Sequence, residues 1–276
     1  LSLPDRWILS RLHGLIANVQ RLFDTYQYGE AGRQIYEFLW SEFADWFIEI
    51  SKETLYGADE AAKSRERHVL AYTLETALRL LHPYMPFLTE EVWQYLPHEG
   101  EALIIARWPE ADASFRDEEA EAAMPVLIEL ISGIRNVRAT YEVDPGRRLK
   151  ALAHGGSHTE LIATYAPLFE RLARIEQIDS LAANDDAPDK AASVVVGDAT
   201  LYLPLAGMVD IDAERQRLQA EMENLTAQLE RSEKLLGNKG FVEKAKPEVV
   251  QRERDKLADL QTRQEAVKSR LVALAG

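Results

Sequence analysis

The amino-acid sequence predicts a mainly α-helical protein that also contains one small α+β domain. Three different hydrophobic periods along the 276 residues support this fold class. Apolar residues recur every three or four positions over residues 4–143, which is the period of an amphipathic helix. The period is two around residues 147–153 and 178–203, as in strands, and residues 218–274 follow a heptad pattern. We therefore expect three domains, at residues 1–145, 146–207 and 208–276.

The first domain should be an antiparallel bundle of five helices joined by short connections. Its first helix begins near residue 4, and its second is rich in aromatic residues. The third should stop before Pro83 and the fifth before Pro145, because the residue before a proline disfavours the helical conformation. The last four helices are expected at about residues 32–52, 63–81, 88–95 and 118–143.

The second domain should be an α+β unit of roughly sixty residues, close to the lower size limit for an independent core. Alternating apolar residues over 149–153 indicate a strand. Ser157 and Glu160 have the spacing of a capping box, so a helix should run from there to about Leu172. Further strands are expected at residues 178–181, 193–196 and 200–203.

The third domain should be a hairpin of two long helices that form an antiparallel coiled coil. Gly237 and Gly240 should end the first arm and Pro247 should begin the second. Each arm of about 25 residues would extend about 38 Å at 1.5 Å per residue. Gln264 is the one polar residue expected at a core position. The apolar core positions are Leu218, Met222, Leu225, Leu229, Leu236, Val250, Leu257, Leu260, Val267, Leu271 and Leu274.

Composition and missing motifs exclude several classes of function. The absence of cysteine excludes disulfides, thiolate metal sites and cysteine nucleophiles, and it fits a reducing, cytoplasmic setting. No window approaches the roughly 18 apolar residues of a membrane helix, and the first residues do not form a signal peptide, so no membrane partner is expected. Phosphate-loop, GxGxxG, HExxH and GxSxG motifs are absent, and no histidine pair has a credible ligand spacing. We therefore expect neither catalysis nor a metal site.

The net charge of −14, taken alone, argues against a nucleic-acid partner. Its distribution changes that interpretation. Residues 208–276 contain 13 basic and 13 acidic residues, so the whole negative excess lies in residues 1–207. Within that acidic part, five basic residues crowd one short stretch: Arg135, Arg138, Arg147, Arg148 and Lys150.

Five blocks of the sequence resemble, in order, the anticodon-binding bundle of class I aminoacyl-tRNA synthetases. They are DRWILSRL (5–12), YEFLWSEFADWFIEISK (36–52), LRLLHPYMPFLTEEVWQYLP (78–97), IIARWPE (104–110) and ISGIRNVRATYEVDPGRRL (131–149). Leucyl and isoleucyl enzymes share several of these blocks, so the bundle alone leaves the amino acid open. LPLAGMVDIDAERQRLQAE (203–221) and KLLGNKGFVEKAKPEVVQRERDKL (234–257) resemble the C-terminal coiled-coil arm of valyl-tRNA synthetases. Because the leucyl and isoleucyl relatives lack that arm, the resemblance favours the valyl family.

The resemblance implies that this chain is the tRNA-binding, C-terminal portion of a longer enzyme. The chain also begins without methionine, which fits this expectation. Such an enzyme uses ATP through His-Ile-Gly-His-like and Lys-Met-Ser-Lys-Ser-like motifs, and hydrolyses mischarged threonyl-tRNA in an editing domain. Neither motif occurs in this chain. Those activities would belong to the remainder of the synthetase, upstream of Leu1. The fragment itself would be a monomer that uses no cofactor, catalyses nothing and binds tRNA with a valine anticodon.

Residue types suited to RNA occur in three places. Unpaired bases stack on aromatic or guanidinium planes, while lysine and arginine hold phosphates. Tyrosines lie between the first two helices, with arginines expected near the same end. Two arginines three residues apart resemble the family's basic exit helix, and lysines cluster at the hairpin tip, where the family comparison implies contact with the tRNA elbow. The candidates are Arg6, Arg11, Tyr26, Tyr28, Arg33, Arg135, Arg138, Lys234, Lys239, Lys244 and Lys246.

Each candidate also has an interpretation as an ordinary surface side chain. The large aromatic residues Trp40, Trp46, Phe47, Trp93 and Trp108 stand at helical spacing beside apolar residues, and we expect them in the core. For the whole chain, the alternative function is a protein-interaction module, in which the coiled coil binds another protein or itself and the acidic bundle is a scaffold. Salt dependence separates the two functions, because phosphate contacts release counterions.

Overall fold

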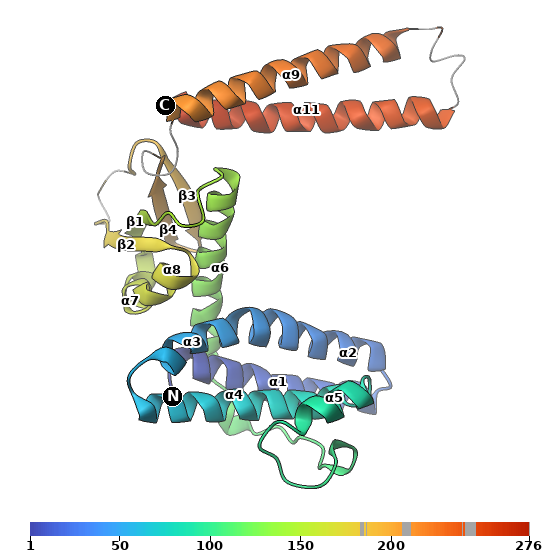
Figure 1. The fold of residues 1–276 in the computed structure, drawn as a ribbon, viewed down its shortest axis with the longest axis vertical. Coiled ribbons are helices and arrows are strands. Elements are labelled where there is room, and N and C mark those ends of the chain that lie inside the picture. The colour runs from blue at the N-terminus through green and yellow to red at the C-terminus, as the bar shows by residue number, and fades with distance from the viewer. Residues whose placement is uncertain (183–184, 186, 206–210, 239, 241–246, 276) are drawn as a thin grey trace. The chain divides into compact units, whose positions relative to one another are not determined.

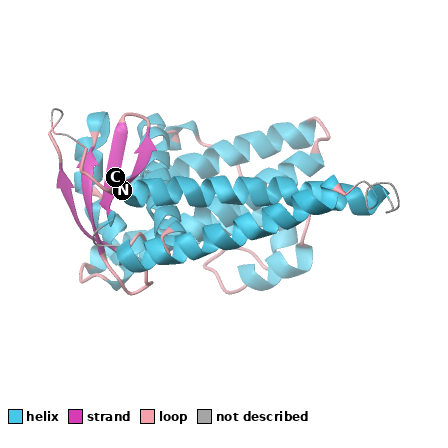
Figure 2. Ribbon diagram, turned by 90° about the horizontal axis from the view of Figure 1, so that it is seen from above, coloured by secondary structure: helices cyan, strands magenta, loops and turns pink. Residues whose placement is uncertain are grey.

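The structure, a computed structural model, describes residues 1–276 except 183–184, 186, 206–210, 239, 241–246 and 276. It is mainly helical with one small sheet, as the sequence predicts (Figures 1 and 2). Contacts divide the chain into two units, Leu1–Glu129 and Leu130–Gly276. The division falls inside helix α6 (Glu118–Thr140), whereas the sequence predicts a boundary at residue 145 and a third domain.

The first unit is a helical bundle, and its helices cover the five predicted segments. Helix α1 packs against α2 and α4, and α3 packs against α4 (Figure 1). Before α6, the elements are α1 (Leu3–Asp24), α2 (Tyr28–Glu37), the π-helical segment η1 (Phe38–Phe47), α3 (Ile48–Tyr56), α4 (Glu60–Leu81), α5 (Pro86–Trp93) and the 3-10 turns η2 (Leu103–Ile105) and η3 (Ala113–Phe115).

Helix α1 begins at a capping box and buries one continuous face. The Ser2 hydroxyl accepts a hydrogen bond from the Asp5 backbone N–H, and the Asp5 carboxylate accepts one from the Ser2 N–H at 2.9 Å. Ile8, Leu12 and Val19 on the apolar face are fully buried. Because this face contacts α2, η1 and α4, α1 forms the centre of the bundle.

The second helical segment differs from the prediction in its start and in its winding. It begins at Tyr28 instead of residue 32, and its middle part, η1, has the wide turn of a π-helix. Bonds from i to i+5 place residues five apart on one face, and Phe38 and Phe43 are both buried. Trp40 is 59% exposed and stacks on Tyr36, with ring centroids 6.2 Å apart. The expectation that Trp40 lies in the core is therefore wrong.

The second unit contains the end of α6, a small α+β domain and a helical hairpin. The sheet has the strand order β2-β1-β4-β3; β1 pairs with β2 in parallel, and the other two pairs are antiparallel. The elements of the α+β domain are β1 (Leu149–His154), the 3-10 turn η4 (Gly156–His158), α7 (Thr159–Thr164), α8 (Ala166–Leu172), β2 (Ile175–Ser180), β3 (Ala191–Val196) and β4 (Ala199–Pro204).

The helix predicted at residues 157–172 is two short helices, α7 and α8, and the predicted capping box does not form. Ser157 instead donates its hydroxyl and its backbone N–H to the Asp198 carboxylate, at 3.0 and 2.8 Å. These bonds hold the β3–β4 turn. The helical run is interrupted at Tyr165, and Pro167 stands in the first turn of α8, where its missing N–H costs no hydrogen bond.

Helix α6 approaches the sheet closely at a glycine. A Cβ atom built on Gly133 would lie 2.2 Å from Cγ1 of Val194 in β3, far inside normal contact distance. Val194 is buried, and so are Ile131 and Ile134, which stand close to Gly133 in the sequence of α6. The approach of α6 to β3 therefore requires a residue without a side chain at position 133.

The helical hairpin consists of α9 (Ile211–Gly237) and α11 (Pro247–Ala275), which lie antiparallel, with Pro247 as the first helical residue (Figure 1). Leu218, Leu225, Leu229, Val250, Leu260 and Val267 are buried between them. Gln264 donates to the Thr226 hydroxyl across the pair at 3.0 Å. Gln264 is not the one polar residue in the seam, because buried Ser232 donates its hydroxyl to Glu253 at 2.6 Å.

A buried acid makes the stability of the bundle depend on pH. Glu66 in α4 is 5% exposed, and burial, followed by the charge of Asp5, raises the pKa of Glu66 from 4.5 to about 7. A raised pKa in the folded state favours the protonated form. Its contribution to stability is therefore complete below about pH 4.5 and is lost as the pH rises through 7.

Glu66→Gln should remove this loss. Urea unfolding should show the variant more stable than the unsubstituted chain at pH 8, by on the order of 1 to 3 kcal/mol, since one pKa unit corresponds to about 1.4 kcal/mol. The two should be nearly equal at pH 4. Glu53→Gln, which changes an exposed glutamate of α3, is the matched control and should show no such pH dependence. Parallel pH profiles for all three chains would contradict the prediction.

Gly133→Ala should destabilise the second unit by roughly 1 to 3 kcal/mol, because the new methyl group overlaps Val194 and α6 must move from β3. Thermal unfolding followed by circular dichroism measures the loss. Adding Val194→Ala should recover part of it by removing the overlapping methyl groups. Additive losses in the double variant would show that the close contact is not the cause.

Candidate nucleic-acid interface

Tyr26 stands in the turn between α1 and α2 in a conformation that glycine usually occupies. Its φ of 59° is left-handed. The Tyr26 N–H donates to the Phe23 carbonyl, and the Gln27 N–H donates to the Leu22 carbonyl at 2.8 Å, which is the Schellman pattern of a helix end. A residue other than glycine pays a cost there, of roughly 1 to 2 kcal/mol. Nevertheless, the ring is 80% exposed and gains little from burial.

Three tyrosines, Tyr26, Tyr28 and Tyr84, form an aromatic surface around this turn. The rings of Tyr26 and Tyr28 are 6.3 Å apart, edge to face. Tyr84, between α4 and α5, donates its hydroxyl to the Tyr28 carbonyl. Phe23 supports the surface from α1, with its ring 5.3 Å from that of Tyr28 and 5.4 Å from that of Trp108. We call Tyr26, Tyr28 and Tyr84 the tyrosine surface.

The structure places Arg6 away from this surface, contrary to the expectation that the arginines lie near the same end. Arg6 is in the first turns of α1, and Tyr26 follows its last turn. The helix is continuous over 22 residues, so it extends about 33 Å at 1.5 Å per residue. Arg6 instead forms an ion pair with Asp117 at 2.9 Å. Arg6 therefore lies at the opposite end of α1 from the tyrosine surface.

Arg11 and Arg33 do meet, in a polar cavity of about 520 Å³ between α1 and the second helical segment, together with Arg116. Each is held by carboxylates. Arg11 donates two bonds of 2.8 Å to Glu42, and Arg33 donates to Glu30 at 2.8 Å and also binds Glu37. The Arg33 guanidinium lowers the pKa of Glu30 to about 2. These arginines are neutralised within the protein, so a phosphate would have to compete with a carboxylate.

The two arginines near the end of α6 have different surroundings although they are three residues apart. Arg135 is exposed and donates from Nε to the Leu172 carbonyl at 2.8 Å, at the end of α8. Arg138 is 9% exposed, and it donates from Nη2 to the Asp144 carbonyl at 3.0 Å. Burial, followed by the nearby charge of Arg174, lowers the pKa of Arg138. Its burial counts against the predicted direct contact with RNA.

At the hairpin, Lys234 is exposed in the last turn of α9. Lys239, Lys244 and Lys246 lie outside the described residues. The RNA contacts of all eleven candidates stay predictions. Tyr84, Tyr36 and Trp40 are exposed aromatic residues that the sequence does not single out as candidates, because their exposure depends on the folded structure.

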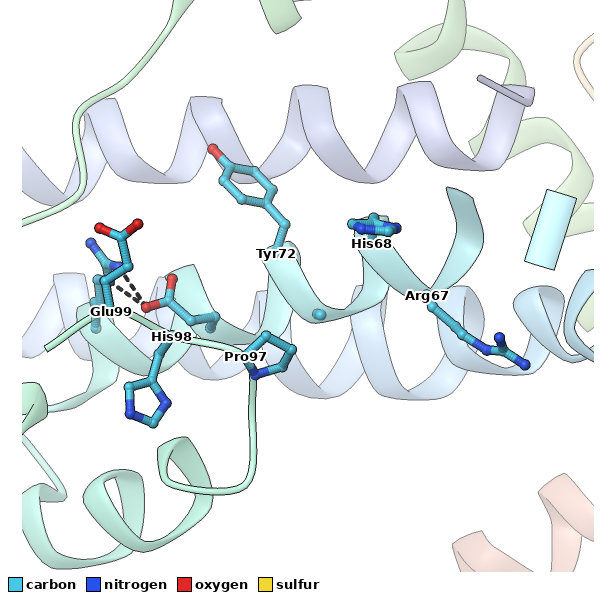
Figure 3. Close-up of a pocket in the computed structure, with 9 residues that line it drawn as sticks. Arg67, His68, Tyr72, Pro97, His98 and Glu99 are labelled. Carbon is cyan, nitrogen blue, oxygen red and sulfur yellow. Dashed lines mark hydrogen bonds and ion pairs between the residues drawn. The ribbon is translucent and has the colours of Figure 1, made fainter. Parts of the chain in front are cut away.

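A second cavity, of about 600 Å³, lies between α4 and the segment after α5. Arg67, His68 and Tyr72 line it from α4, and His98 and Glu99 from the other side (Figure 3). Its buried wall is a structural network in which Glu75 accepts hydrogen bonds from Arg79 at 2.6 Å and from the Trp93 indole at 2.9 Å. The His98 ring stacks on Trp93. These contacts give Glu75 and Arg79 a structural role in the wall of the cavity.

Two negative findings apply to the part of the chain that the structure describes. No group of three or more metal-ligating side chains is close enough to hold a metal ion there. No described helix is long and apolar enough to cross a membrane.

Comparison with known proteins agrees with the architecture. A family model of the anticodon-binding domain of tRNA ligases matches residues 5–153, and a model of the valyl-tRNA synthetase tRNA-binding arm matches residues 210–275. Both describe tRNA-binding modules, and their order along the chain is the order of the bundle and the hairpin.

Curated relatives match over the whole length. The valine–tRNA ligase of Bacillus subtilis is 41% identical over 280 residues, which cover 100% of this chain and 31% of that protein. Those of Enterococcus faecalis and Geobacillus stearothermophilus are each 42% identical, and each match covers 99% of this chain and 31% of the relative. The chain thus spans about a third of the length of these relatives. It belongs to the valine–tRNA ligase family, and it comprises the family's anticodon-binding domain and tRNA-binding arm.

Proposed function

We propose that this chain is the tRNA-recognition part of a valine–tRNA ligase and binds tRNA with a valine anticodon. The observation that carries the proposal is the match of two tRNA-binding family models, in order, over residues 5–153 and 210–275. Valine activation with ATP, transfer to tRNA and editing would then belong to the remainder of the enzyme upstream of Leu1. The fragment would work as a monomer in the cytoplasm, without a cofactor of its own.

The tyrosine surface is the proposed contact for unpaired anticodon bases. Base stacking on aromatic rings contributes about 1 to 3 kcal/mol per base. Tyr26 presents its ring to solvent from a strained backbone position, and Tyr28 stands edge-on beside it. Backbone strain at an exposed aromatic residue is consistent with a binding role, because packing does not explain it.

Phosphate contacts in the acidic bundle would arise by exchange of partners. Arg11 and Arg33 are already oriented by Glu42, Glu30 and Glu37. A phosphate that displaces a carboxylate gains a preformed guanidinium, but the displaced carboxylate must be solvated. Such contacts should therefore fix the position of the RNA backbone on the bundle more than they raise the affinity. The fragment should accordingly bind tRNA weakly.

The hairpin would supply a second contact with the tRNA. Its apolar seam is filled by the partner helix, and the Ser232–Glu253 and Thr226–Gln264 hydrogen bonds match the two helices in one register. A seam satisfied within one chain favours a monomer over an interaction module. Lys234 is the proposed contact with the tRNA elbow, together with Lys239, Lys244 and Lys246, which lie outside the described residues.

The fragment should bind valine tRNA more tightly than unrelated tRNAs in a filter-binding assay, because it carries the reading bundle. Affinity should fall steeply as salt rises, since phosphate contacts release counterions. With ATP and valine it should release no pyrophosphate above background. Equal affinity for all tRNAs would refute anticodon reading, and salt-independent capture of a protein partner would favour the interaction module.

Tyr26→Gly should weaken tRNA binding while leaving the protein at least as stable. The loss of one stacked base predicts a decrease of about 5- to 150-fold, from the 1 to 3 kcal/mol of stacking. Glycine relieves the left-handed strain, so the melting temperature should hold or rise. Tyr95→Ala, at an equally exposed tyrosine after α5, is the control and should change neither. If Tyr26→Gly bound tRNA as tightly as the unsubstituted chain, the tyrosine surface would not be the stacking site.

A further inference from the structure

Four cations gather at the start of the first two strands of the small domain. Arg147, Arg148, Lys150 and Arg174 are all exposed. Within the described part of the chain, none of their side chains forms an ion pair, which distinguishes them from Arg6, Arg11 and Arg33. We call Arg148, Lys150 and Arg174 the strand-start cations, because the sheet itself brings them together.

The parallel pairing of β1 and β2 sets their positions. Leu149 pairs with Ile175, and the Leu149 N–H donates to the Arg174 carbonyl at 3.0 Å. Arg148 and Arg174 therefore precede paired residues on neighbouring strands, which lie about 4.8 Å apart. Leu149 and Ile175 are buried. Because side chains alternate along a strand, Lys150 in β1 stands on the side opposite Leu149. Arg148 and Arg174 directly precede the two strands, and both are exposed.

Arg138 adds a buried positive charge to this group. Its Nη1 is buried and has no hydrogen-bond partner among the described residues. Arg174 is close enough for its charge to lower the pKa of Arg138. Among residues 148–150 and 174–176, Glu176 is the one acid. The charge of Asp144 opposes that of Arg174 at Arg138, but Arg138, Arg148, Lys150 and Arg174 together outnumber Asp144 and Glu176, so the group keeps an excess of positive charge.

We propose that the strand-start cations bind the phosphate backbone of RNA, with Arg138 reinforcing the positive charge from within. The proposal rests on the proposed tRNA-binding function and adds a contact on the small domain that does not read bases. A phosphate matches the fork of a guanidinium and supplies the missing negative charge. Because contacts to phosphate carry no sequence information, this site should strengthen binding to every tRNA alike.

Two glycine substitutions provide a matched test. Arg174 and Lys190 are both exposed, both in the small domain, and both left-handed, with φ of 57° and 55°. Arg174→Gly and Lys190→Gly therefore remove one positive charge each and relieve the same backbone strain. Melting temperatures should hold or rise in both. Arg148→Gln, alone and combined with Arg174→Gly, tests the neighbouring strand.

Binding of the 276-residue chain to a valine tRNA and to an unrelated tRNA is measured over a range of salt concentrations. Arg174→Gly should weaken binding to both tRNAs on the order of tenfold and reduce the salt slope by about 1. Arg148→Gln should behave similarly, and the double variant should lose more. Lys190→Gly should leave affinity and slope unchanged.

Three outcomes count against the proposals in different ways. If Arg174→Gly and Arg148→Gln bind both tRNAs like Lys190→Gly, the strand-start cations are not an RNA site. If the loss is confined to the valine tRNA, the contact reads sequence and the phosphate site is overturned. If the unsubstituted chain binds neither tRNA, the proposed function itself fails, and the strand-start site falls with it.

Discussion

Burial of one face of α1 is the constraint on which the first unit depends. Ile8, Leu12, Ile16 and Val19 are almost completely removed from water, and the second helical segment and α4 pack against them. Since burying each such side chain contributes about 1.5 to 3 kcal/mol, this face holds the bundle together. It also keeps α1 straight and unbroken, so that the capping box at Ser2 and the aromatic turn at Tyr26 stand at its two ends.

The pairing of arginine with carboxylate determines where this acidic protein presents positive charge. In the bundle, Arg6, Arg11 and Arg33 are bound by neighbouring acids, so their residue type alone does not make them RNA ligands. In the small domain, Arg148 and Arg174 carry no such partner within the described residues. The tyrosine surface thus belongs to the first unit and the strand-start cations to the second.

The hairpin shows how polar residues specify a helix pair. Leucine and valine at heptad spacing drive its burial, but apolar seams tolerate several registers. The buried Ser232 hydroxyl and the Glu253 carboxylate satisfy each other in one register only, and a slip would leave a buried polar group without a partner. Ser232 and Glu253 stand at heptad positions in the sequence, but their pairing across the two helices appears only in the folded hairpin.

The sequence by itself determined the fold class, the family, and the bounds of α4, the strands and both hairpin helices to within a few residues. These properties follow from local features of the chain, namely the hydrophobic period, the positions of proline and glycine, and contiguous motifs. Tertiary structure decided the π-helical winding that exposes Trp40, the diversion of Ser157 to Asp198, and the distance between Arg6 and Tyr26. It also decided which arginines are neutralised and that Arg148 and Arg174 are neighbours. Those properties depend on residues far apart in the chain, whose proximity exists only after the chain has folded.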